Sequence, residues 1–116
     1  MTDRERLLER MYAAFNARDI DTGLASLHAR VDWPNGWEGG RIVGREGVRD
    51  YWTRQWAAID PVVTPVGYRE APGDRVAVEV RQIVRDRDGR LLVDGTVRHV
   101  YRFRDGLVAA MDIEKP

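Results

Sequence analysis

The sequence of 116 residues is long enough to bury one hydrophobic core and too short for two, so we expect a single domain over residues 1–116. Its 19 basic and 19 acidic residues are interspersed and cancel to a net charge of zero, which argues against nucleic acid or an anionic membrane surface as a partner. The absence of cysteine excludes a disulfide framework, a thiolate metal site and a cysteine nucleophile.

The chain begins with a charged segment, Thr2–Arg6, that lacks the apolar run of a signal peptide. Nowhere does the sequence contain the roughly 18 consecutive apolar residues of a membrane span. We therefore expect a soluble, cytoplasmic protein without a membrane partner. Lys115 is the only lysine, so a Schiff-base mechanism has almost no candidate.

The first expected helix covers residues 3–18. Thr2 and Glu5 have the spacing of a capping box, in which a hydroxyl and a carboxylate satisfy free amides at a helix start. Apolar side chains then recur every three or four residues and form one buried stripe. A second helix should run from Asp19 or Asp21 to about residue 28, so that the two helices form a hairpin.

Two of the four tryptophans, Trp33 and Trp37, flank a glycine-rich loop between two short strands. The strands are expected over residues 31–33 and 41–43. The loop contains the turn pair Asn35-Gly36. Large aromatic side chains beside such a turn either wall a cavity or close one end of the core, and the sequence leaves both interpretations open.

The hydrophobic period changes near Pro61. Before it, a third helix is expected from Arg45, and the proline ends that helix. After it, β-branched runs separated by turn signals indicate strands. Four strands are expected, over residues 62–70, 76–85, 91–104 and 107–114. Helices in the first half followed by a meander of antiparallel strands indicate an α+β fold.

Three segments carry a resemblance to a known family. They are Tyr12-Ala-Ala-Phe-Asn-Ala-Arg-Asp19, Gly44-Arg-Glu-Gly-Val-Arg-Asp-Tyr-Trp52 and Val97-Arg-His-Val-Tyr-Arg-Phe-Arg-Asp-Gly106. With them the whole chain resembles the NTF2-like superfamily, specifically its SnoaL-like and ketosteroid-isomerase-like members. The resemblance implies a cone, in which three N-terminal helices pack in a strongly bent antiparallel sheet. It also implies an apolar pocket at the open end of the cone and a pair of cones joined through the outer sheet face.

The ketosteroid isomerases of this superfamily use a carboxylate base after the first strand, a tyrosine on the first helix and a protonated aspartic acid on a sheet strand. By position, the tyrosine falls on Met11, with Tyr12 one residue away, and the acid falls on His99. The base falls within residues 33–35, where no side chain is ionisable. SnoaL-type cyclases need one acid–base group in an apolar cavity, and this chain can meet that requirement.

His99 is the expected acid–base residue, because an imidazole titrates near neutral pH and the strand that carries it has an apolar face. Its neighbours on that face are Val97, Tyr101 and Phe103. A two-residue turn at Asp105-Gly106 would set His99 opposite Asp112, whose carboxylate would orient the ring. A three-residue loop would set Met111 there instead. The alternative is a histidine that only satisfies a neighbouring group in the core.

Glu79 and Arg81 interrupt an otherwise apolar strand, and the hairpin at Asp88-Gly89 decides which face they occupy. A three-residue loop with a glycine bulge would place them on the face of the histidine. A two-residue turn would place Val78 and Val80 there instead. We expect the two charged residues on the outer face, since charges are rarely fully buried.

A homodimer is expected through the outer sheet face, because Val78, Val80 and Val100 leave apolar area on one side or the other of the sheet. His28 is expected at a helix C-terminus, where a cation is favourable. His28 and His99 do not have the spacing of metal ligands, so neither a metal nor another cofactor is predicted.

The sequence thus predicts a protein that binds a small hydrophobic organic ligand, with acid–base chemistry of an isomerase, cyclase or hydrolase type. His99 is the expected acid or base, Asp112 is its orienting carboxylate, and Tyr12 or Asn35 is a polar contact to the substrate. The expected pocket residues are Tyr12, Phe15, Trp33, Asn35, Trp37, Trp52, Trp56 and Tyr101. The alternative is a non-catalytic ligand-binding or dimerisation module in which the same residues only pack.

Overall fold

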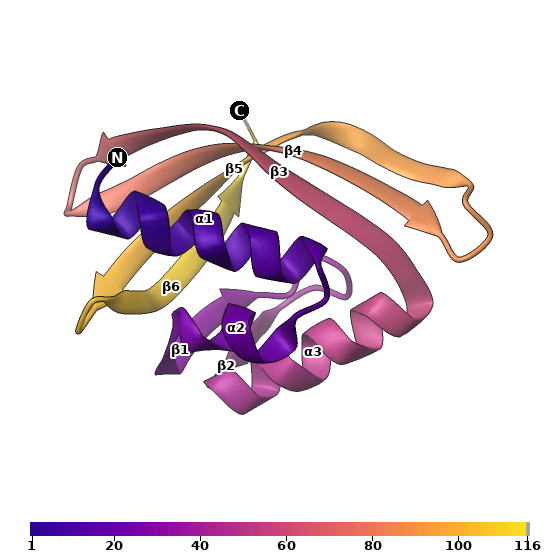
Figure 1. Cartoon of the computed structure of the whole chain (residues 1–116), viewed down its shortest axis with the longest axis horizontal. Coiled ribbons are helices and arrows are strands. Elements are labelled where there is room, and N and C mark those ends of the chain that lie inside the picture. The colour runs from indigo at the N-terminus through magenta and orange to yellow at the C-terminus, as the bar shows by residue number, and fades with distance from the viewer. Residues whose placement is uncertain (116) are drawn as a thin grey trace.

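The computed structural model of the chain describes residues 1–115. The helices are α1 (Asp3–Asn16), α2 (Ile20–Ala25) and α3 (Arg45–Ala58), and the strands are β1 (Leu27–Pro34), β2 (Arg41–Val43), β3 (Ile59–Ala71), β4 (Arg75–Asp86), β5 (Leu91–Arg104) and β6 (Leu107–Glu114). The six strands form one sheet in the order β2-β1-β6-β5-β4-β3. Figure 1 shows the long strands β3 to β6 curving over α1, with α3 on the same concave side. This arrangement confirms the predicted α+β cone.

The sheet is mixed rather than wholly antiparallel, which corrects one detail of the prediction. Strand β1 runs parallel to β6, whereas the other four pairs of neighbours are antiparallel. Strands β1 and β6 lie at opposite ends of the sequence. Their relative orientation is set by the packing of the elements between them, so no local turn signal in the sequence predicts it.

Helix α1 begins with the predicted capping box. The Thr2 hydroxyl accepts a hydrogen bond from the Glu5 amide at 3.1 Å, and the Glu5 carboxylate accepts one from the Thr2 amide at 3.0 Å. The helix ends at Asn16 rather than at the predicted Arg18. Arg18 has a φ of 61°, in the left-handed region, and the chain turns there.

Helix α2 is capped by Asp19, one of the two predicted caps, but it ends at Ala25, three residues before the predicted end. The residues from Leu27 onward pair with other strands instead, so tertiary pairing overrides the helical pattern. His28 therefore lies on β1, and its Nδ1 accepts a hydrogen bond from the Arg30 amide at 3.0 Å. Its expected place at a helix C-terminus is wrong.

Helix α3 begins at the predicted Arg45, and β2 occupies the predicted residues Arg41–Val43. The helix ends at Ala58, and β3 begins at Ile59, three residues before the predicted strand. Pro61 therefore lies inside β3. A proline is tolerated there because β3 is an edge strand of the sheet.

The hairpin between β4 and β5 decides which side chains face the helices. Its loop holds three residues, 87–89, closed by a hydrogen bond between the residues on either side. Such a loop alone would turn Val78 and Val80 outward. A β-bulge at Leu92 adds one residue, however, and the strands then pair as they would across a two-residue turn. Both valines are fully buried on the inner face. The outer face of the same strand carries Glu79 and Arg81, as predicted.

A second bulge, in β6, changes the partner of His99. Asp105-Gly106 forms a two-residue turn, the first of the two alternatives considered for this hairpin, with φ of 53° and 76°. The pairing then shifts by one residue, so that His99 lies opposite Ile113. Asp112 lies opposite Val100 and hence on the other face of the sheet. The predicted pairing of His99 with Asp112 is therefore wrong, because it assumed a ladder without a bulge.

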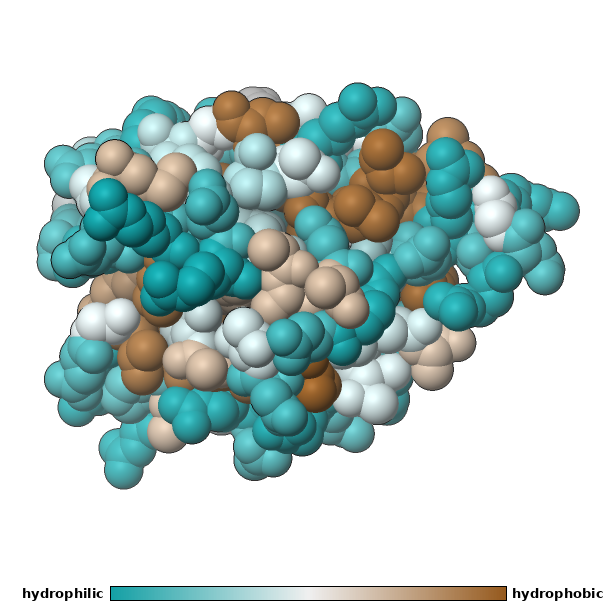
Figure 2. Space-filling view, in the orientation of Figure 1, coloured by the Kyte–Doolittle hydropathy of each residue, from teal (hydrophilic) through white to brown (hydrophobic). Residues whose placement is uncertain are grey.

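The outer sheet face is charged, which removes the reason given for a dimer. Val78 and Val80 point inward, and Val100 is only 4% exposed. Ion pairs lie on this face, between Arg98 and Glu79 at 2.6 Å and between Arg81 and Asp94 at 3.3 Å. Figure 2 shows polar side chains over most of the visible surface, with apolar side chains gathered toward the β4–β5 hairpin. Within residues 1–115, no helix combines the length and apolar character needed to cross a membrane.

Candidate functional site

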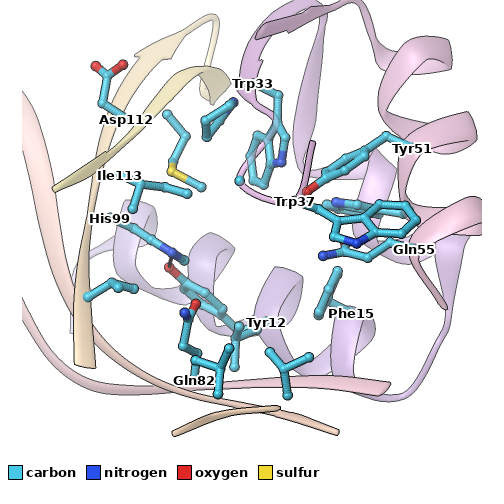
Figure 3. A pocket seen from close by; sticks show the side chains of 18 of the residues that line it. Tyr12, Phe15, Trp33, Trp37, Tyr51, Gln55, Gln82, His99, Asp112 and Ile113 are labelled. Carbon is cyan, nitrogen blue, oxygen red and sulfur yellow. Dashed lines mark hydrogen bonds between the residues drawn. The ribbon is translucent and has the colours of Figure 1, made fainter. Parts of the chain in front are cut away.

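A cavity of about 570 Å³ opens between α1, α3 and the inner face of the sheet. Aromatic side chains form much of its wall (Figure 3). They are Tyr12, Phe15, Trp33, Trp37, Tyr51, Trp52 and Tyr101. The volume lies in the range of small-molecule sites, which are concave, largely apolar and furnished with a few polar groups. At its mouth the lining residues Trp37, Leu92, Val93 and Ile113 are exposed.

Three polar side chains meet at the inner end of the cavity. The Tyr12 hydroxyl lies 2.8 Å from Nδ1 of His99 and 2.5 Å from the Tyr101 hydroxyl. Tyr12 comes from α1, and the other two residues stand two positions apart on the inner face of β5. Figure 3 shows the Tyr12 hydroxyl directed at the His99 ring. All three side chains are buried, so solvent does not compete for these bonds.

All three groups are neutral near pH 7. Burial lowers the pKa of His99 to about 4, because a charged imidazolium is unfavourable away from water. Burial also raises the pKa of Tyr12 well above its usual value, and its contact with Tyr101 raises it further. Burial raises the pKa of Tyr101 as well. The inner end of the cavity therefore carries hydrogen-bonding capacity without net charge.

A count of hydrogens fixes the role of Nδ1 of His99 in these bonds. If Tyr101 donates to Tyr12 and Tyr12 donates to Nδ1, both hydroxyl hydrogens are used in short bonds. If Tyr12 donates to Tyr101 instead, Tyr101 donates to Nδ1 over a longer distance of 3.4 Å, so the first arrangement is favoured. If Nδ1 were the donor, one of the two hydroxyl hydrogens would have no acceptor in the part of the chain that the structure describes. Neutral His99 then carries its hydrogen on Nε2. That nitrogen bonds no described residue and is available to a ligand.

Asp112 belongs to the outer face of β6, borders only the edge of the cavity and does not contact His99; Figure 3 shows its carboxylate directed away from the cavity. Its carboxylate binds Arg41 at 3.0 Å, and Arg41 also binds the Asp32 carboxylate at 2.9 Å and the Met111 carbonyl at 2.8 Å. Arg41 thus links β2, β1 and β6. These two paired residues are the charged members of the cavity lining, within residues 1–115. Asp112 is placed to hold strands together rather than to orient the imidazole.

Two other expected pocket residues lie elsewhere. The side-chain oxygen of Asn35 accepts hydrogen bonds from two backbone amides of its own loop, at 3.2 and 2.7 Å, so it shapes the loop instead of facing the cavity. Trp56 packs behind the cavity wall, with its ring centroid 5.3 Å from that of Phe15 and 5.9 Å from that of Trp52. The remaining expected residues all line the cavity.

Besides Arg41, three uncharged polar lining residues were not expected from the sequence: Tyr51, Gln55 and Gln82. Tyr51 and Gln55 stand one turn apart on α3, beside the expected Trp52, so helical spacing alone could have placed them on that face. Gln82 lies on the same face of β4 as Val78. That this is the inner face depends on the register, which the bulge sets. No group of three metal-binding side chains occurs in the described part of the chain.

A family model described as a SnoaL-like domain matches residues 8–111 of the sequence. A search of curated proteins finds no match.

Solved structures share the fold. An NTF2-like protein of unknown function from Burkholderia pseudomallei has a TM-score of 0.85 at 24% identity, over 100% of this chain and 92% of its own. TerC, co-crystallised with polyporic acid, has a TM-score of 0.85 at 24% identity, over 99% of this chain and 92% of its own. RV0760c from Mycobacterium tuberculosis, in complex with estradiol-17beta-hemisuccinate, has a TM-score of 0.81 at 18% identity, over 96% of this chain and 92% of its own.

Proposed function

The chain belongs to the SnoaL-like family of NTF2-like proteins, and on that premise we propose that it binds a small, uncharged ring compound and polarises one oxygen of that compound with His99. The observation that carries the proposal is a series of uncharged, hydrogen-bonded side chains, from Tyr101 through Tyr12 to His99, at the inner end of an aromatic cavity.

The cavity wall supports a flat, largely apolar ligand. Aromatic side chains offer large faces to a ring compound at little cost in side-chain freedom. An isolated ionic group would find no free counter-charge in the cavity lining within residues 1–115, because the charged lining residues Arg41 and Asp112 already bind each other. Two proteins of the same fold, TerC and RV0760c, were crystallised with small organic molecules, which supports a ligand of that kind.

The polar cluster supports chemistry at a carbonyl group. A neutral imidazole with its hydrogen on Nε2 donates to a carbonyl oxygen and favours the form in which that oxygen gains negative charge. Isomerisation, and ring closure through a carbon nucleophile, both pass through such an enolate-like species, which forms when the neighbouring carbon loses a proton, here to solvent water. Tyr12, which donates to Nδ1 of His99, holds the ring in the required tautomer. This chemistry fits the isomerase and cyclase types more closely than a hydrolase that needs Asp112 as a free carboxylate.

Hydrogen exchange of 1-tetralone in deuterated water tests the proposal without knowledge of the natural substrate. Polarising the carbonyl accelerates exchange of the hydrogens on the neighbouring carbon, which proton NMR measures. We expect wild-type protein to accelerate the exchange and His99→Gln to lose roughly 100- to 1,000-fold of that rate, the usual cost of removing one such donor. His28→Gln is the matched control, because His28 lies on β1 outside the cavity. Equal rates in both variants would contradict a role for His99.

A second candidate is ligand binding without catalysis. It is favoured by one observation: no free carboxylate lines the cavity within residues 1–115 to take a proton from carbon. Binding of 1-tetralone without faster exchange would select this candidate. Calorimetric titration of the same samples separates the two, because it measures binding whether or not exchange occurs.

We retain the homodimer as a proposal, now with a polar interface. The outer sheet face carries arginine and carboxylate side chains that a second copy could share. Association through exposed charges weakens as salt screens them. Sedimentation at micromolar concentration should therefore show dimers at low salt and fewer at high salt. A species of one chain's mass under both conditions would contradict the dimer.

A further inference from the structure

The chain contains two glutamines, Gln55 and Gln82, and both line the cavity. Gln55 comes from α3 and Gln82 from the inner face of β4, and both are half-buried. Figure 3 shows the two side chains entering the cavity from its helix side and its sheet side. The proposed carbonyl chemistry uses neither of them.

The two amides are unpaired. Neither forms a hydrogen bond with another residue in the region that the structure describes, and neither is among the described buried side-chain atoms that lack a partner, so both amides are open to the cavity. A glutamine amide offers two donor hydrogens and an acceptor oxygen. Both amides are therefore free to bind a ligand that fills the cavity.

The backbone position of Gln82 lies away from that of His99 along the sheet. His99 is opposite Val78, and Gln82 is four residues further along β4. At roughly 3.3 Å per residue, the two backbone positions are about 13 Å apart along the strand. Gly95 is opposite Gln82, and a Cβ built on it would meet nothing within 4 Å, so there is free space beside the amide.

We propose that Gln82 and Gln55 form a second recognition site in the cavity, which binds a neutral hydroxyl or carbonyl group at the end of the ligand remote from His99. The ligand class is then an elongated, uncharged ring compound with an oxygen function at each end. This inference rests on the proposed function, because it takes the first oxygen to be held at Tyr12 and His99.

A matched pair of probes tests the second site. 4-Phenylphenol has one hydroxyl group, and 4,4′-dihydroxybiphenyl has the same frame with a second hydroxyl at the far end. Calorimetric titration at pH 7 should give wild-type protein a three- to tenfold higher affinity for the dihydroxy compound, about one net hydrogen bond. Gln82→Leu should abolish that advantage and leave the affinity for 4-phenylphenol within about twofold. Gln55→Leu should reduce the advantage in the same direction.

Tyr12→Phe separates this inference from the proposed function. It removes the group that fixes His99, so both probes should bind more weakly while the dihydroxy compound keeps its relative advantage. Equal loss for both probes in Gln82→Leu, or no loss for either, would overturn the second site alone. Failure of wild-type protein to bind either probe would overturn the proposed function together with the second site.

Thermal unfolding tests whether Gln82 has a purely structural role. An amide kept for packing would make Gln82→Leu less stable. An amide kept for a ligand should leave the unfolding midpoint of the free protein unchanged or higher, because the substitution breaks no hydrogen bond to another described residue and adds apolar contact. A lower midpoint in Gln82→Leu would count against the second site.

Discussion

The two ends of the cavity are built in opposite ways. At the inner end, Tyr12, His99 and Tyr101 are buried, neutral and bonded to one another. At the mouth, Arg41 and Asp112 form an ion pair whose side chains are 39% and 45% exposed. Bonds hidden from water keep their strength, whereas exposed ion pairs contribute little. Substitutions at the inner end should therefore change stability and chemistry far more than substitutions at the mouth.

The largest expected difference lies between two tryptophans. Trp52 is 2% exposed and packs against Trp33 and Phe15, whereas Trp37 is 38% exposed at the mouth. Trp52→Ala should lower the free energy of unfolding by about 3–5 kcal/mol, because it leaves a cavity in the core. Trp37→Ala should cost about 1 kcal/mol or less. Urea unfolding measures both, and Trp52→Phe provides a milder variant. Equal losses would contradict the distinction between the two ends.

The next effect concerns pH. Burial lowers the pKa of His99 to about 4, against 6.5 in the unfolded chain, so the unfolded chain binds the proton more tightly. The stability contributed by neutral His99 is complete above pH 6.5 and is lost as the pH falls toward 4, and the full loss corresponds to about 3 kcal/mol.

Urea unfolding between pH 7 and pH 4 measures this loss. The protein should lose more stability over that interval than His99→Gln does, because glutamine does not titrate. His28→Gln is the control and should retain the pH dependence. If His99→Gln and wild-type protein lose equal stability, the imidazole is not held neutral by burial.

The sequence predicted the order of helices and strands and most of the cavity wall, because both depend on local periodicity. The cone itself was implied by the resemblance to the NTF2-like superfamily. Helical spacing placed Trp52 and Phe15 inward, and alternation placed His99 and Tyr101 on one strand face. Such patterns need no knowledge of the partner strand. The predicted residues that line the cavity all come from helices or strands, apart from Trp37 in the loop after β1.

The contacts within the site could not be predicted from the sequence, because they depend on the register in which the strands pair. One bulge moved Asp112 to the other face of the sheet, and another kept Glu79 on the outside despite a three-residue loop. A bulge adds one residue to a β-rich run and leaves no distinctive composition. The bond between Tyr12 and His99 joins residues 87 positions apart, so no spacing rule reports it.

A smaller effect is expected from single hydroxyl groups. Tyr101→Phe removes the hydrogen that Tyr12 accepts and should cost about 1 kcal/mol of unfolding free energy. Tyr68→Phe is the matched control, since the Tyr68 hydroxyl is buried without a hydrogen-bond partner among the described residues. That change should be neutral or stabilising. Chemical denaturation of both variants measures the difference, and the opposite order would contradict the hydrogen-bonded cluster.

The smallest effect is expected at the mouth, from Asp112→Asn. The carboxylate is 45% exposed and binds Arg41, which keeps its bonds to Asp32 and to the Met111 carbonyl. Solvent screening and these remaining bonds limit the loss to less than about 1 kcal/mol. Asp112 lies on the opposite sheet face from His99, so the imidazole pKa, measured by proton NMR on the folded protein, should not change. A carboxylate that oriented the ring would hold the imidazole pKa up, and its removal would lower that value. A lower His99 pKa in Asp112→Asn would therefore show that the two ends of the cavity act as one unit.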